Sequence, residues 1–182
     1  MKELRQLFDD ASFTYTYILT DLLSNEAVII DPVDTHLNEY LNIIRNNQLK
    51  LKYVMETHAH ADHVTSAGNL CQSTGAIAAT PMYCNIIPAE IQLKDKQELR
   101  FGEGQIILAI HTPGHTAGSM TFYWKNKLFT GDNALVQLYK EIDIEKLFLS
   151  EKSFNKIMDI KNFSIWEINK DKHKKILQFR LK

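Results

Sequence analysis

Three histidines and one aspartate stand within six positions of the chain, in the segment Thr57-His58-Ala59-His60-Ala61-Asp62-His63. Imidazole nitrogen and carboxylate oxygen are common ligands of zinc and iron. In a loop, His58 and His60 can turn toward one ion, while Asp62 and His63 can turn toward a second ion nearby. Exposed polar residues at a strand end are the alternative interpretation. Four such groups directly after an apolar stretch favour a metal site instead.

Two later segments offer further ligands. His115 follows Pro113-Gly114, a dipeptide that favours a tight turn. Asp132 follows Gly131, which allows the backbone to approach a neighbour closely. Each segment alone is typical of an ordinary turn. Together with His58, they predict a site in which ligands from three separate loops converge.

Hydrophobic spacing predicts the elements that position these loops. Helices are expected at about 35–47, where apolar residues recur at helical spacing, and at 64–74, with Gly75 just past the end. Strands are expected at 14–20, 27–30, 51–55, 76–79, 98–101, 106–110, 120–124 and 127–129. This interleaved order favours a sandwich of sheets with helices on the outer faces. The three loops then follow strand ends, where a rigid scaffold presents chemical groups.

Composition limits the class of protein. The chain has 182 residues, of which 45% are hydrophobic and 24% charged, and a formal net charge of −1. These values are typical of one soluble globular domain and argue against a disordered, collagen-like or membrane-spanning chain. A charge near zero predicts neither a nucleic-acid partner nor a membrane surface. No signal-peptide pattern opens the chain, and Cys71 and Cys84 form no disulfide framework, so we expect a cytoplasmic protein.

The three motifs in this order resemble the metal-binding motifs of the metallo-β-lactamase superfamily. They are the His-x-His-x-Asp-His run over 58–63, Pro113-Gly114-His115, and Gly131-Asp132. Further segments are similar to those of the persulfide dioxygenases in that superfamily: 5–9, 15–17, 30–33, 55–58, 112–119 and 129–132. The resemblance covers about residues 4–135.

The resemblance implies an α/β (α+β) fold, the αββα sandwich of the metallo-β-lactamases, with its second half incomplete. We expect a metallo-β-lactamase-like domain over residues 1–135. The family continues with an Arg-rich stretch and a Pro-Gly-His-Asp-Tyr motif, and neither follows Leu135; Gly and Pro are both absent beyond Gly131. Residues 136–182 are therefore expected to form a divergent tail that is partly helical and poorly ordered.

The same resemblance implies an enzyme that uses one Fe(II) ion per chain. Its implied ligands, and catalytic residues, are His58, His115 and Asp132. The implied reaction, part of hydrogen sulfide metabolism, oxidises glutathione persulfide with O₂ to sulfite and glutathione. Thr116 stands where the family contacts glutathione, and the family tends to form homodimers. His60, Asp62 and His63 would be the remnant of a second metal site, or would orient the iron ligands through hydrogen bonds.

Two alternatives stay open at this point. A zinc-dependent hydrolase of the glyoxalase II or lactonase type uses the same motifs with two ions. An inactive, degraded copy is the other alternative, because the family's Arg and Tyr contacts to glutathione lie in the motifs missing after Leu135. Losing such contacts removes substrate positioning, so any dioxygenase activity is expected to be impaired.

Overall fold

The computed structural model describes residues 2–86, 89–132, 163–166 and 178–181. Two α-helices and two short 3-10 turns accompany the strands in this part of the chain: α1 (Leu37–Asn46), α2 (Ala67–Thr74), η1 (Asp34–His36) and η2 (Met82–Cys84). The strands are β1 (Leu4–Asp9), β2 (Thr14–Thr20), β3 (Glu26–Ile30), β4 (Lys50–Met55), β5 (Ile77–Pro81), β6 (Ile91–Leu93), β7 (Glu98–Phe101), β8 (Gln105–His111), β9 (Met120–Trp124), β10 (Lys127–Phe129), β11 (Phe163–Trp166) and β12 (Gln178–Leu181).

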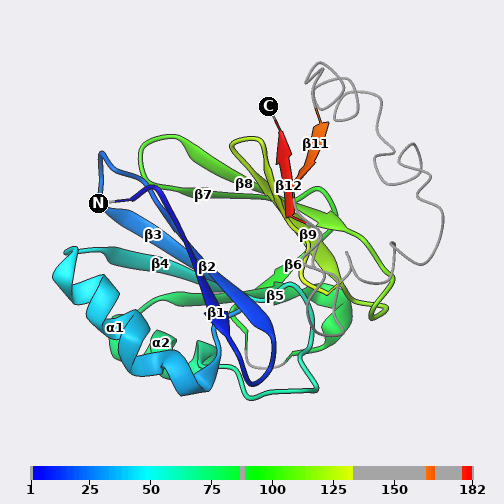
Figure 1. The fold of residues 1–182 in the computed structure, drawn as a ribbon, viewed down its shortest axis with the longest axis horizontal. Coiled ribbons are helices and arrows are strands. Elements are labelled where there is room, and N and C mark those ends of the chain that lie inside the picture. Colours follow the sequence, from blue (N-terminus) through cyan, green and yellow to red (C-terminus); the bar gives the residue numbers. More distant parts are fainter. Residues whose placement is uncertain (1, 87–88, 133–162, 167–177, 182) are drawn as a thin grey trace.

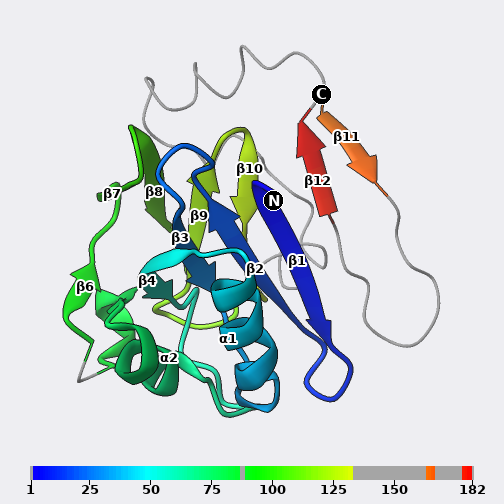
Figure 2. The same ribbon diagram turned by 90° about the vertical axis from the view of Figure 1, so that its left-hand side faces the viewer.

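The first sheet contains β1 to β6 in sequential order. Its first three strands pair antiparallel, whereas β3, β4, β5 and β6 run parallel to one another. Parallel neighbours need a crossover connection, and α1 and α2 supply it between β3 and β4 and between β4 and β5. Both helices lie on one face of this sheet (Figures 1 and 2).

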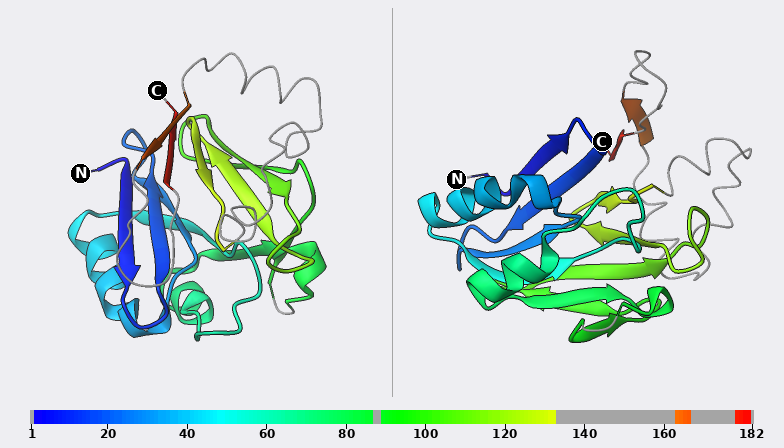
Figure 3. Two further views of the ribbon diagram at one scale, coloured as in Figure 1. Left: turned by 45° about the vertical axis from the view of Figure 1, so that its right-hand side comes forward. Right: turned by 90° about the horizontal axis from the view of Figure 1, so that it is seen from below.

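The second sheet is antiparallel, in the order β10-β9-β8-β7, and packs against the other face of the first (Figure 3). The elements from β1 to β10 therefore form a helix layer and two sheet layers, in agreement with the expected mixed α/β sandwich. The hairpin of β9 and β10 turns through Lys125 and Asn126, whose φ angles of 43° and 61° suit such a turn.

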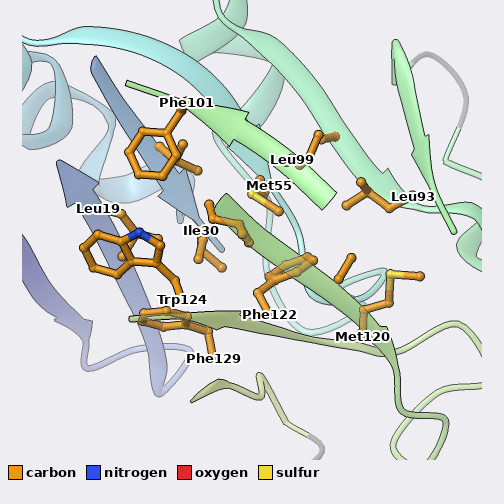
Figure 4. Packing of buried hydrophobic residues seen from close by; sticks show 14 residues of the cluster. Leu19, Ile30, Met55, Leu93, Leu99, Phe101, Met120, Phe122, Trp124 and Phe129 are labelled. Atoms are coloured by element: carbon orange, nitrogen blue, oxygen red, sulfur yellow. The ribbon is translucent and has the colours of Figure 1, made fainter. Parts of the chain in front are cut away.

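Two hydrophobic cores hold the three layers together. The core between the sheets takes Ile30 and Met55 from the first sheet and Phe122 and Trp124 from the second, all at most 1% exposed (Figure 4). The other core lies between the first sheet and the helices, and includes Tyr40 of α1 and Leu70 of α2. Burying each large apolar side chain contributes about 1.5–3 kcal/mol, so the two cores hold the layers in a fixed arrangement.

Within residues 1–135, the strands and α-helices depart from the sequence prediction in three main places. β1 and the short β6 were not expected, and α2 begins at Ala67 rather than at residue 64. The residues before α2 are held in an extended path: the Ser66 amide and the Thr65 hydroxyl both donate to the Pro32 carbonyl, at 3.0 and 2.9 Å. This backbone pairing prevents an earlier start of the helix.

The expected tail, 136–182, is described at 163–166 and 178–181. There β11 and β12 form an antiparallel pair, with Phe163 opposite Leu181. The predicted helical and poorly ordered parts lie outside the described residues. None of the helices in the described ranges is long and apolar enough to cross a membrane.

Candidate metal centre

The parallel pairing of β3 and β4 brings two polar segments together. Ile30 pairs with Met55 at the carboxyl ends of these strands, so Asp31 lies beside Glu56 and Thr57. The Thr57 amide donates to Asp31 Oδ1 at 2.7 Å, and the Thr57 hydroxyl donates to Asp31 Oδ2 at 2.8 Å. The loop that begins at Thr57 is thereby fixed to the end of β3.

The other two loops are attached to the same point. The Met120 amide at the start of β9 donates to the Thr57 carbonyl at 2.8 Å, which ties the loop after β8 to the loop after β4. Gly131 has a φ of 51°, and a Cβ atom there would collide with Thr57 Oγ1. Only glycine allows the loop after β10 to approach so closely, and this approach carries Asp132 toward His58.

His58, His115 and Asp132 come together as the spacing of the motifs predicts. Each offers one ligand atom, and these atoms all lie within 4.8 Å of one another. The rings of His58 and His115 meet edge to face, with centroids 4.9 Å apart, and His115 Nε2 lies 3.7 Å from Asp132 Oδ2. His58 is 2% exposed, whereas the side chains of His115 and Asp132 are 40% and 37% exposed. The group is closed on one side and open to solvent on the other.

The surroundings of His58 fit a metal ligand. Its Nδ1 lies 2.9 Å from Thr57 Oγ1. Its Nε2 is buried and has no hydrogen-bond partner among the described residues. Burial, followed by the positive charge of His60, lowers the pKa of His58 to about 4, so the ring is neutral at pH 7. A neutral imidazole with an unpartnered buried nitrogen is the form that binds a metal ion.

The other predicted residues form a second group beside the first. Ligand atoms of His60, Asp62 and His63 also lie within 4.8 Å of one another. The rings of His60 and His63 are 4.4 Å apart, and His63 Nδ1 lies 3.2 Å from Asp62 Oδ1. His63 Nε2 is buried without a hydrogen-bond partner in the described part of the chain. This group has the donor set for a second ion.

A third group was not predicted as a cluster. Asp31 and Glu56 are buried and both contact His60, whose Nε2 lies 3.2 Å from Asp31 Oδ1 and 3.1 Å from Glu56 Oε2. Burial tends to lower the pKa of His60, but the hydrogen bonds to Asp31 and Glu56 outweigh it and raise the pKa to about 11. Burial raises the pKa of Glu56 to about 7. The contacts occupy Nε2, one of the two ring nitrogens of His60.

Thr116, the predicted glutathione contact, lies in the loop that carries His115. Its hydroxyl is 2.8 Å from Ser119 Oγ, and its amide donates to the same oxygen at 3.1 Å. Its carbonyl accepts from the Gly114 amide at 3.1 Å. In this structure Thr116 therefore shapes the turn that presents His115.

Comparison with known proteins agrees with this architecture. Residues 9–82 match the model of the metallo-beta-lactamase superfamily. Over 139 residues, 74% of this chain and 53% of the relative, the chain is 37% identical to the mitochondrial persulfide dioxygenase ETHE1 of Mus musculus. The chain belongs to the metallo-β-lactamase superfamily. Within it, the crystal structure of ETHE1 from Myxococcus xanthus has a TM-score of 0.66 and 36% identity, over 70% of this chain and 56% of that one.

Hydrolases of the superfamily are also similar. The chain is 30% identical to a hydroxyacylglutathione hydrolase of Pelagibacter ubique over 152 residues, which is 81% of this chain and 61% of that protein. The chain spans about half the length of the persulfide dioxygenases that it matches.

Proposed function

We propose that this chain holds one iron ion through His58, His115 and Asp132 and oxidises glutathione persulfide. The observation that carries the proposal is the convergence of these three ligand atoms within 4.8 Å, with the buried Nε2 of His58 unpartnered among the described residues. The identity of 37% to a persulfide dioxygenase supports the choice of substrate.

The donor set suits iron. Two imidazoles and one carboxylate are the ligands of many non-haem Fe(II) oxygenases, in which further coordination positions stay open. Iron held there would supply those open positions for O₂ and for a persulfide sulfur. The overall reaction takes up O₂ and water, oxidises the outer sulfur to sulfite and releases glutathione.

The protein residues supply binding and orientation in this proposal. His58 is locked by burial, whereas His115 and Asp132 border the open side, from which a substrate reaches the site. Asp31 and Glu56 hold His60 beside His58. Thr116, through its bonds to Ser119, keeps the His115 loop in its turn. We propose that residues 1–135 form the functional domain and that 136–182 are an appended tail.

Oxygen uptake tests this proposal. Iron-loaded protein is supplied with glutathione persulfide, and O₂ and sulfite are followed together. We expect one sulfite for each O₂ consumed, and no uptake by His115→Ala. The matched control is His36→Ala, because His36 contacts Asp9 and Glu39 and belongs to none of the metal-ligand groups. Folded, iron-loaded native protein that consumes no O₂ would refute the dioxygenase and favour the inactive copy.

A zinc hydrolase is the second candidate, favoured by the group of His60, Asp62 and His63. Two ions would activate a water molecule and stabilise the developing oxyanion. This candidate predicts two zinc ions per chain and hydrolysis of a glutathione thioester. An Asp62→Ala variant would then lose thioester hydrolysis, whereas the dioxygenase predicts that native protein leaves the thioester intact.

The cytoplasmic location and the homodimer stay predictions. Cell fractionation tests the first and sedimentation equilibrium tests the second.

A further inference from the structure

The Thr57 hydroxyl lies between a carboxylate and a histidine. Thr57 is 1% exposed, and its Oγ1 is 2.8 Å from Asp31 Oδ2 and 2.9 Å from His58 Nδ1. The three metal-ligand groups consist of histidines and carboxylates, and Thr57 lies between two of them. Its hydroxyl contacts His58, which belongs to the group with His115 and Asp132. It also contacts Asp31, which belongs to the group with Glu56 and His60.

The direction of the two hydrogen bonds follows from the number of protons. A hydroxyl carries one hydrogen, and an ionised carboxylate can only accept. The Thr57 hydrogen is therefore directed to Asp31, and a lone pair of Oγ1 faces His58. That lone pair accepts a hydrogen bond from His58, so the proton of the neutral ring lies on Nδ1. The other nitrogen, Nε2, is left with a bare lone pair.

The position of Nε2 agrees with this assignment. It is buried and has no hydrogen-bond partner among the described residues, and His58 belongs to the group formed with His115 and Asp132. A protonated Nε2 would be a buried donor without an acceptor, which costs about 1–3 kcal/mol. A bare Nε2 can instead coordinate an ion.

We propose that Thr57 is a positioning residue whose hydroxyl connects Asp31 to His58, fixes the tautomer of His58 with the proton on Nδ1, and so presents Nε2 to the metal ion. This inference rests on the proposed function only in requiring a metal at His58; it does not depend on which reaction follows.

The backbone around Thr57 holds the connection in place. Asp31 has a φ of 51°, an unusual conformation that aspartate tolerates, and its Oδ1 also accepts from the Thr57 amide at 2.7 Å. Gly131 leaves room for the Thr57 side chain, because a Cβ atom at Gly131 would collide with Thr57 Oγ1. Thr57 thus has little freedom to rotate its hydroxyl away from either partner.

The tautomer is measured in metal-free protein. Long-range ¹H–¹⁵N correlation spectra of ¹⁵N-histidine-labelled protein distinguish a proton on Nδ1 from one on Nε2. We expect Nδ1–H at His58 in the native chain and in Thr57→Ser, which keeps the hydroxyl. Thr57→Val keeps the shape but removes both hydrogen bonds, so the tautomers should mix. In Asp31→Asn, the amide nitrogen that replaces Oδ2 donates to Thr57, so the hydroxyl turns to His58 and favours Nε2–H.

Metal affinity is the second measurement, with redox-silent Zn²⁺ as the probe. Changes to groups that orient a ligand commonly weaken metal binding 10- to 100-fold. We expect a Kd increase in that range for Thr57→Val and Asp31→Asn, and a change below about threefold for Thr57→Ser. Near-ultraviolet circular dichroism checks that each variant is folded.

Two results would overturn the inference: an Nε2–H tautomer of His58 in the native metal-free protein, or native Zn²⁺ affinity in folded Thr57→Val. The native spectrum decides the matter even where a variant does not fold. An oxygen-uptake assay that fails while His58 shows Nδ1–H removes the proposed reaction and leaves the role of Thr57 intact.

Discussion

His58 and His115 differ in what surrounds them, and this difference defines the candidate site. The first is buried and held through Nδ1, whereas the side chain of the second is 40% exposed on a turn shaped by Thr116 and Ser119. A rigid ligand on one side and accessible ligands on the other leave space for a substrate. The site depends on Gly131 as well as on its ligands, because the close approach of Gly131 to Thr57 brings Asp132 toward His58.

Gly131→Ala tests that dependence. The new Cβ would collide with Thr57 Oγ1, and the residue would also keep a strained positive φ. We expect the free energy of unfolding to fall by about 1–3 kcal/mol and the Kd for Fe(II) to rise by about tenfold or more. Chemical denaturation and anaerobic titration measure the two effects.

Gly104→Ala is the matched control, since Gly104 has a φ of 81° with nothing near its Cβ position. It should lose about 1–2 kcal/mol of stability through backbone strain alone and bind iron as the native chain does. Equal iron affinity in both variants would contradict the role assigned to the close approach.

Strand ends are the elements that build the site. The loops after β4, β8 and β10 could be predicted because each apolar strand is followed by polar residues. The cluster of Asp31, Glu56 and His60 could not, since it depends on the parallel register of β3 and β4, which no local pattern reveals. β1 was missed for a related reason: Leu4–Asp9 mixes charged and apolar residues and becomes a strand by pairing with β2.

A carboxylate also joins the two sheets. Asp21, after β2, accepts hydrogen bonds from the Ser24 hydroxyl at 2.6 Å, from the Glu103 amide at 3.0 Å and from Gln105 Nε2 at 3.1 Å. Glu103 belongs to the turn between β7 and β8, and Gln105 is the first residue of β8. These bonds, the one from Ser24 first, lower the pKa of Asp21 from 3.8 to about 2.

The sign of this shift predicts acid sensitivity. Folding favours the ionised form of Asp21. Its hydrogen bonds therefore stabilise the fold fully above about pH 4, and this stabilisation is lost as the pH falls toward 2. We expect Asp21→Asn to lower the free energy of unfolding by about 1–3 kcal/mol at pH 7 and by less near pH 2. Urea unfolding across this range measures the difference. Asp10→Asn, at an exposed carboxylate, should change little; an Asp21→Asn effect that does not depend on pH would contradict the assignment.

From β1 to β10 the described residues form a helix layer and two sheets, and the loops after β4, β8 and β10 converge. Metal binding should therefore stabilise these layers as a unit. A ligand present at 100 times its Kd adds about 2.7 kcal/mol to the free energy of unfolding. For a chain of this size we expect Tm to rise by roughly 5–10 °C under that condition.

Differential scanning fluorimetry under anaerobic conditions follows this rise with Fe(II). His36→Ala should show the native increase. His115→Ala and Asp132→Ala should melt at the same temperature with and without iron. If Fe(II) does not change the Tm of the native chain, the group of His58, His115 and Asp132 does not bind iron.

In the proposed site, a single iron ion is held by His58, His115 and Asp132. The number of iron ions per chain tests this proposal. Chains are reconstituted with Fe(II) under argon and desalted, and iron and protein are then quantified in the same sample. We expect about one iron per native chain and none in His115→Ala. Two ions per native chain, or iron retained in folded His115→Ala, would contradict it.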